Sequence, residues 1–159
     1  MRRKVRLLIG MLLSALIVTA VYSATSASAS GDGTKTLVLE ERDSRETEVD
    51  VGEPGFGAGD QFVFRSKLFK NDERVGTVGG ACTIVGILNE TNADVQCVAT
   101  LRLKHGQITA QGFITFAEET APFTVAVTGG TGRYRNAHGE IVITENPDAG
   151  TAEYSIRLT

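Results

Sequence analysis

The residues that could do chemistry in this sequence are few, and most lie where turns are expected. His105 and His138 each stand next to a glycine. Neither has a second histidine or a cysteine at the spacing of metal ligands, so we expect solvated turn residues and no metal site. The sequence holds no G-x-S-x-G elbow and no plausible Ser/His/Asp set, which argues against hydrolases of those types.

Two other groups of residues could carry chemistry. Glu40, Glu41 and Asp43 could supply an acid or a base, and a solvated acidic strand edge is the alternative interpretation. The run Gly129–Gly132 resembles a phosphate loop in composition. It lacks the P-loop lysine and the third glycine of a dinucleotide motif, and it leads into a strand. We therefore expect a tight turn with positive φ there.

The first 29 residues have the pattern of a secretory signal peptide. Four basic residues precede an apolar run, Leu7–Tyr22, and the small residues Ala27–Ala29 form an A-x-A cleavage site. A membrane anchor is the alternative interpretation of this run. Cleavage would leave residues 30–159 as one domain, so the elements that position any site must come from one core. We expect a secreted, extracellular protein.

The charge and hydropathy of residues 30–159 exclude some partners. Loss of the four basic leader residues would leave 12 basic against 19 acidic side chains, a formal charge of about −7. This balance is the opposite of a nucleic-acid-binding footprint, so no nucleic-acid partner is expected. No further long apolar run occurs, and the cleaved protein should not span a membrane.

The two cysteines stand at positions that a hairpin would bring together. Export to an oxidising compartment favours a disulfide. In a hairpin centred on a polar turn at Asn89 and Glu90, the residue numbers of each opposed pair add up to 179. Cys82 then lies directly opposite Cys97. A free Cys82 thiol lining a cavity is the alternative.

Apolar and polar residues alternate over most of residues 30–159, which predicts half-buried strands. The pattern is clearest in the runs 95–103, 108–116, 123–127 and 154–158, and tight-turn residues separate the runs. We expect about eight strands and an all-β fold, a barrel or a sandwich. Residues 43–59, rich in acidic residues and glycine, are predicted to form a loop.

Four blocks of the chain resemble allene oxide cyclases, in order and in register. Gly59–Phe69 resembles their strand G-D-x-V-P-F-x-N-K-L-Y, and Arg74–Cys82 their R-I-G-I-T-A-G-x-C. Gly106–Gly112 is similar to their G-H-I-S-V-Q-G. Val127–Gly139 resembles the T-G-G-[ST]-G-x-[FY]-x-x-A-x-G signature that they share with plant dirigent proteins. The resemblance covers nearly all of the chain after the leader.

The resemblance implies a calycin-like, eight-stranded antiparallel β-barrel with an apolar cavity. Members of this superfamily cyclise a fatty-acid epoxide or direct the stereoselective coupling of radicals, with no metal or organic cofactor. It therefore implies a small hydrophobic molecule as partner, no cofactor, and a homotrimer as in the plant relatives. The alternative is a non-catalytic extracellular carrier or interaction module whose interior is filled by side chains.

The resemblance also implies five candidate ligand-binding residues. Cys82 falls on the cavity cysteine of the cyclases, and Ser66 on the asparagine that helps to hold a polarising water. Their first-strand glutamate aligns with Glu40, and Arg42 stands where they carry an asparagine. Phe64 completes the set as part of an aromatic wall. We expect Glu40 or Ser66 to polarise the ligand.

Overall fold

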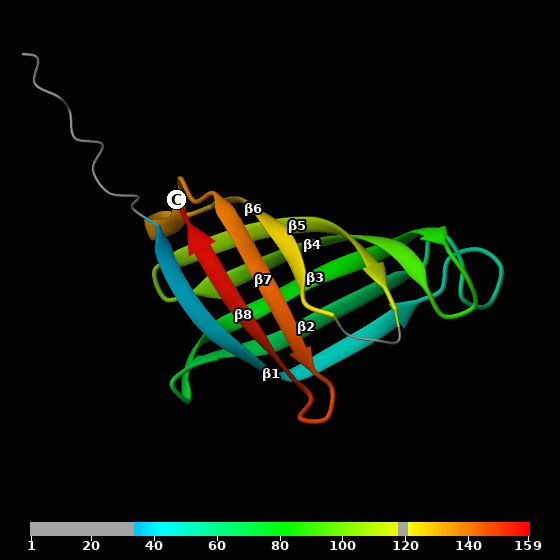
Figure 1. Ribbon diagram of the computed structural model, residues 1–159, viewed down its shortest axis with the longest axis horizontal. Helices are drawn as coiled ribbons and strands as arrows, with labels where there is room; N and C mark the ends of the chain where they lie inside the picture. Colours follow the sequence, from blue (N-terminus) through cyan, green and yellow to red (C-terminus); the bar gives the residue numbers. More distant parts are fainter. Residues whose placement is uncertain (1–33, 118–120) are drawn as a thin grey trace, which may run out of the picture. The chain divides into compact units, whose positions relative to one another are not determined.

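The described part of the chain forms one closed β-barrel. This computed structural model describes residues 34–117 and 121–159, and the expected signal peptide lies outside them. Eight antiparallel strands follow one another in chain order, and β1 pairs with both β2 and β8 to close the barrel (Figure 1). The expected all-β, eight-stranded antiparallel barrel is confirmed.

The strands are β1 (Lys35–Val49), β2 (Gln61–Lys70), β3 (Glu73–Ile87), β4 (Ala93–Leu103), β5 (Gly106–Phe116), β6 (Phe123–Gly130), β7 (Gly139–Asn146) and β8 (Thr151–Leu158). One short 3-10 helix, η1 (Gly132–Tyr134), separates β6 from β7. In residues 34–117 and 121–159 no helix is long and apolar enough to span a membrane.

The inward positions of the strands form the core of the barrel. Leu68, Ile108 and Ile156 are completely buried and pack in one apolar cluster with residues from all eight strands. Burying one such side chain contributes about 1.5–3 kcal/mol relative to exposure. The alternation in the sequence thus has the expected cause: one face of each strand is turned towards the core.

The β3–β4 hairpin has the register that the cysteine positions predict. Cys82 pairs with Cys97. From Gly76 to Ile84, the residue numbers of every pair between β3 and β4 add up to 179, as expected. Gly80 lies so close to β4 that an added Cβ would come within 2.3 Å of the Val98 carbonyl oxygen. A side chain there would push β3 and β4 apart, so the hairpin needs glycine at this position.

The glycine-rich run after β6 forms the expected tight turn with positive φ. Gly132 has φ +60°, and an added Cβ would come within 2.3 Å of the His105 carbonyl oxygen. The backbone N–H of Arg133 donates to the same oxygen. The glycine therefore allows η1 to pack against the β4–β5 turn.

The prediction of a loop over residues 43–59 is wrong for its first part, because β1 continues to Val49. After a bulge between Arg42 and Arg45, the strand pairs with β2, with Glu46 opposite Phe64. Asp43 in the bulge has φ +54°, a conformation that aspartate adopts more readily than most residues. The charged composition suggested a loop, but backbone pairing with β2 stabilises these residues as a strand.

Strand length differs from one side of the barrel to the other. β1 to β5 have 10 to 15 residues, whereas β6, β7 and β8 have 8 each. β1 pairs with β8 only up to Glu41, and β5 pairs with β6 only up to Gln111. The ends of β1 and β5 therefore extend beyond the short strands and leave the wall incomplete at this end.

Candidate functional site

A cavity of about 490 Å³ lies within the barrel at the end where the long strands extend. Its floor is the apolar core, including Leu101, Val125 and Ile141. Ala121 and Pro122, in the connection before β6, line it at the open end. A cavity of this size suits a ligand of the size of a typical drug or cofactor.

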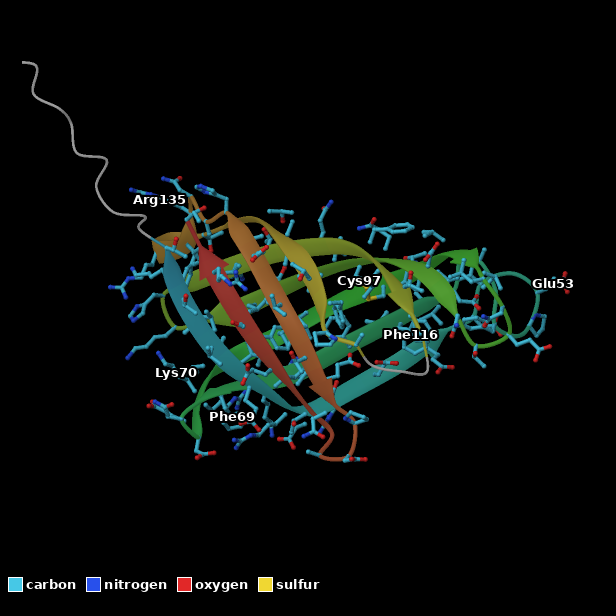
Figure 2. All side chains as sticks on the ribbon, in the orientation of Figure 1. Glu53, Phe69, Lys70, Cys97, Phe116 and Arg135 are labelled. Carbon is cyan, nitrogen blue, oxygen red and sulfur yellow. A yellow bond between two sulfur atoms is a disulfide. The ribbon has the colours of Figure 1, made fainter. Side chains whose placement is uncertain are left out.

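Aromatic side chains form much of the cavity wall. Four of the seven phenylalanines line it: Phe62, Phe64, Phe116 and Phe123. The rings of Phe62 and Phe116 stack with centroids 6.0 Å apart and an interplanar angle of 22°. Phe116 lies toward the end of the barrel that carries Glu53, away from Arg135 (Figure 2). Phe64, predicted from the sequence, is thus in the wall.

A buried polar pair faces this apolar space. The Tyr154 hydroxyl on β8 donates a hydrogen bond to Oε2 of Glu41 on β1. Both side chains line the cavity, and both residues are less than a tenth exposed. Burial, followed by repulsion from the Glu41 carboxylate, raises the pKa of Tyr154 above its usual range. The phenol therefore stays protonated and available as a hydrogen-bond donor at physiological pH.

A second carboxylate joins Glu41 because of the strand register. Glu145 on β7 and Glu41 on β1 both pair with Ala152 on β8. Residues directly opposite one another in a sheet point to the same face, so both glutamates flank the small alanine on the cavity side. Burial raises the pKa of Glu145, and repulsion from Glu41 and Glu46 raises it further.

The bulge in β1 brings a third carboxylate to the cavity. Before the bulge, the odd-numbered residues Leu39 and Glu41 point inward. The extra residue changes this alternation, so the even-numbered Ser44 and Glu46 line the cavity after it. Burial raises the pKa of Glu46, with smaller contributions from the charges of Glu48 and Glu41.

Glu40 and Arg42, both predicted as ligand-binding residues, do not line the cavity. They alternate with Glu41, which points inward, and are bonded to each other, with Arg42 Nε 2.7 Å from Glu40 Oε1. Arg42 also donates to Asp72 over 2.7 Å and stacks on the Phe69 ring. The hydrogen bond from Arg42 holds the pKa of Glu40 below its ordinary value. This exposed network occupies the outer face of the barrel.

Ser66 is buried but does not line the cavity. Its hydroxyl donates to Ser44 Oγ over 3.0 Å, opposite the bulge in β1, and it is 2% exposed. Ser44 itself lines the cavity, so Ser66 can act on a ligand only through Ser44. The structure therefore brings together Phe64 and Cys82 at the cavity and leaves the other three candidates outside it.

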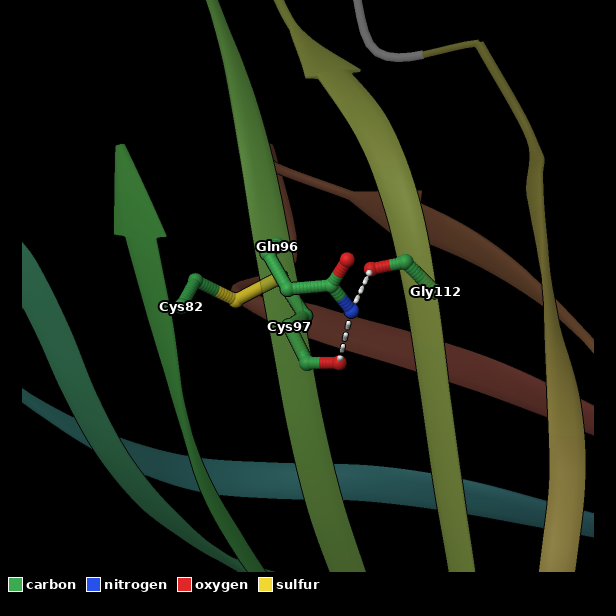
Figure 3. Close-up of a disulfide and its surroundings, with 4 residues drawn as sticks. All are labelled: Cys82, Gln96, Cys97 and Gly112. Carbon is green, nitrogen blue, oxygen red and sulfur yellow. Dashed lines mark hydrogen bonds between the residues drawn. A yellow bond between two sulfur atoms is a disulfide. The ribbon is translucent and has the colours of Figure 1, made fainter. Parts of the chain in front are cut away.

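The predicted Cys82–Cys97 disulfide is present in the cavity wall, between β3 and β4. The Gln96 amide nitrogen on the same wall donates to the carbonyl oxygens of Cys97 and Gly112, over 3.4 and 3.1 Å (Figure 3). It thereby ties β4 to β5 beside the bridge. Cys82 has no free thiol to offer a ligand, so its contribution is to shape the wall.

Sequence reasoning missed Glu46, Glu145 and Tyr154 as site residues. From the sequence, Tyr154 is only the first residue of the alternating run 154–158, and Glu46 lies within the predicted loop 43–59. One signal did point to Glu41. Leu37 and Leu39 define an inward face with a period of two, and Glu41 is the next residue on that face. No local signal indicates Glu145, because its neighbours come from β8 and β1.

The comparisons with known proteins agree with this geometry. Residues 40–158 match the family model of the allene oxide cyclase barrel like domain. Among solved structures, a pyocyanin demethylase is 34% identical, with a TM-score of 0.62, and the alignment covers 79% of this chain and 99% of that one.

Two more distant structures share the fold. An exo-specific intermolecular Diels–Alderase is 19% identical with a TM-score of 0.57, covering 80% of this chain and 98% of that one. A nonspecific heme-binding cyclase of neoabyssomicin biosynthesis is 18% identical with a TM-score of 0.58. The alignment covers 80% of this chain and 66% of that one. With the family match over most of its length and the closed barrel around a cavity, this chain belongs to the allene oxide cyclase barrel-like family.

Proposed function

We propose that this protein is an exported enzyme that binds a small, mainly apolar molecule in the barrel and directs its cyclisation or stereoselective coupling. The observation that carries the proposal is the buried Glu41–Tyr154 pair, which faces a mainly apolar cavity. A cavity serving only as a store for an apolar molecule has no need of a hydrogen-bonded acid pair, which is costly to bury.

The cavity walls supply the first part of the proposed catalysis. Phe62, Phe64, Phe116 and Phe123 hold a flexible or planar ligand in one orientation, and the apolar floor excludes water. Fixing the reacting atoms near each other lowers the entropic part of the barrier. A dry site also protects a reactive intermediate from water.

The polar pair supplies the second part. Tyr154 stays protonated, because its pKa is raised, and its hydroxyl can donate a hydrogen bond to an oxygen or nitrogen of the ligand. Glu41 accepts the hydrogen bond of this hydroxyl in the free site, and it can take up a proton from the ligand as a general base when the hydroxyl turns to the ligand. Proton transfer by a positioned side chain contributes about 10²–10⁴-fold to rates.

Demethylation is a second candidate reaction. It is favoured by the 34% identity to the pyocyanin demethylase over nearly that protein's whole length. A proton donor beside an aromatic cavity would suit that class of substrate as well. The two candidates differ in their product. In demethylation an N-methyl carbon would leave as formaldehyde, with water supplying the oxygen and the heteroaromatic ring of the substrate accepting the two electrons.

The test is to express the full chain in an exporting host and to analyse the protein from the medium by native mass spectrometry. Small molecules released from the barrel are extracted and identified, and the protein is also incubated with pyocyanin and with the extracted molecules. We expect a bound apolar molecule and its conversion by wild type but not by Y154F. An empty barrel would overturn the proposal, and a bound molecule that wild type does not convert would favour a non-catalytic carrier. Equal turnover by wild type and Y154F would exclude the Glu41–Tyr154 pair from the reaction.

A further inference from the structure

The charged groups that line the cavity are all acidic. Glu41, Glu46 and Glu145 line it, and the described residues of the lining include no lysine, arginine or histidine. Arg45 and Arg65 pair with each other in the β1–β2 register at exposed positions. Arg42 is bonded to Glu40 and Asp72 on the outer face. An anionic ligand such as a fatty acid would therefore meet only like charge inside this barrel.

The three carboxylates come from two separate strands and meet at the incomplete part of the wall. Glu145 and Glu41 flank Ala152, and Glu46 follows the bulge on the part of β1 that extends past β8. The charge of Glu41 contributes to the raised pKa of both Glu46 and Glu145, and the charge of Glu46 to that of Glu145, which means that these charges interact. Without a counter-charge, this concentration of negative charge beside an apolar space is unfavourable.

The aromatic rings beside the acids are also suited to a positive charge, and Phe64 lies directly opposite Glu46 in the β1–β2 pairing. Phe62 and Phe116 stack against each other in the lining, and Phe64 and Tyr154 add two more rings. The faces of aromatic rings attract cations, most strongly where the cation is desolvated, and aromatic cages recognise quaternary ammonium groups. Carboxylates and aromatic faces thus favour the same ligand charge.

The geometry does not suit a metal ion. Within residues 34–117 and 121–159, no three His, Cys, Asp or Glu side chains lie close enough together to hold one. The cavity volume of about 490 Å³ also far exceeds that of a bare ion. An organic cation with an apolar body satisfies both the size and the lining.

We propose that the preferred ligand of the barrel is an apolar aromatic molecule with a fixed positive charge, such as an N-alkylated heteroaromatic cation. This inference rests on the proposed function of the same cavity and specifies the ligand class. Glu46 and Glu145 hold the charge at the open end of the cavity. The phenylalanines take up the aromatic body, and Tyr154 and Glu41 remain at its buried side.

The test uses three probes of one shape and different charge: N-methylquinolinium, 1-methylnaphthalene and 1-naphthoate. Binding to the full protein is measured by calorimetry at pH 7 in low salt. We expect the cation to bind about tenfold or more tightly than the neutral probe, and the anion to bind weakest. In E46Q/E145Q the ratio of cation to neutral affinity should fall to about threefold or less, with the neutral probe unaffected.

E153Q is the matched control, since Glu153 stands between Ala152 and Tyr154 on β8 but on the outer face. E153Q should bind the cationic probe in preference to the neutral probe by the same factor as wild type. Circular dichroism checks that each variant is folded. Equal or tighter binding of the neutral or anionic probe would overturn the ligand class while leaving a binding cavity in place. Failure of all three probes to bind would overturn both this inference and the proposed function.

Discussion

Tyr154 on β8 donates a hydrogen bond to Glu41 on β1 inside the cavity. The two residues are far apart in the sequence but become neighbours because β1 closes the barrel against β8. The pair therefore depends on barrel closure, and it couples the stability of the fold to the chemistry of the site.

Replacing Tyr154 by phenylalanine should weaken both stability and activity. The Glu41 carboxylate would lose its donor in a buried place, so we expect the free energy of unfolding to fall by about 1–3 kcal/mol. Turnover of the identified substrate should fall by about 10²-fold or more, because the ligand loses the hydrogen bond that stabilises the charge developing on it. Denaturant unfolding and steady-state kinetics measure the two effects, and unchanged turnover would assign the pair a structural role alone.

The disulfide should stabilise the barrel without taking part in the reaction. In C82A/C97A we expect the free energy of unfolding to fall by about 3 kcal/mol, because the bridge closes a loop with a separation of 15 residues. The substrate should still be converted, at a rate lowered only as far as the wall shifts. Complete loss of turnover in a folded double variant would instead indicate that the sulfur atoms contact the substrate.

The pH dependence of stability should reflect the acids at the cavity. In the fold, burial raises the pKa of Glu46 and Glu145 above the ordinary value of 4.5. A group with a raised pKa stabilises the fold below its unfolded pKa, and this contribution is lost as the pH rises through the folded pKa. Wild type should therefore lose stability from about pH 4.5 upward relative to E46Q/E145Q.

Denaturant unfolding at several pH values measures this difference. Glu41, Glu48 and Tyr154 also face these two carboxylates and remain in both proteins. E153Q, altered on the outer face, should follow the wild-type pH profile. A double variant that is less stable than wild type at pH 7 would contradict the assignment of unfavourable charge to the cavity.

Asp60 should be important for the connection between β1 and β2. Its carboxylate accepts hydrogen bonds from the backbone N–H groups of Val51 over 2.8 Å and Gly57 over 2.7 Å, and it is 8% exposed. D60A leaves both donors without this partner, so we expect a loss of about 2–3 kcal/mol in the free energy of unfolding. Removal of the exposed Glu53 carboxylate in the same connection, by E53A, should change stability by less than about 0.5 kcal/mol.

Variants of Glu40 and Arg42 test whether the outer face contributes to ligand binding. The two side chains are bonded to each other, and Arg42 also donates to Asp72, all outside the cavity. E40Q and R42A should therefore bind cavity ligands within about twofold of wild type, because exposed ion pairs contribute little at a distance. A loss of affinity as large as that caused by E46Q/E145Q would place the ligand on the outer face instead.

The sequence by itself determined the all-β class, the strand number and the Cys82–Cys97 pairing. These follow from local rules, since alternation with a period of two defines the faces of a strand, and one turn fixes the register of its hairpin. The same rule points from Leu37 and Leu39 to Glu41 rather than to Glu40. Assigning Glu40 from a resemblance in sequence introduced a shift of one residue, which moves a side chain to the opposite face.

The tertiary structure alone decided which acids share the cavity. The bulge at Asp43 turns Glu46 inward, and it forms where β1 leaves β8 but stays paired with β2. Glu145 joins Glu41 only because both strands pair with Ala152 on β8. Such contacts depend on how strands distant in the sequence close into a barrel, and the local pattern of residues carries no information about that closure.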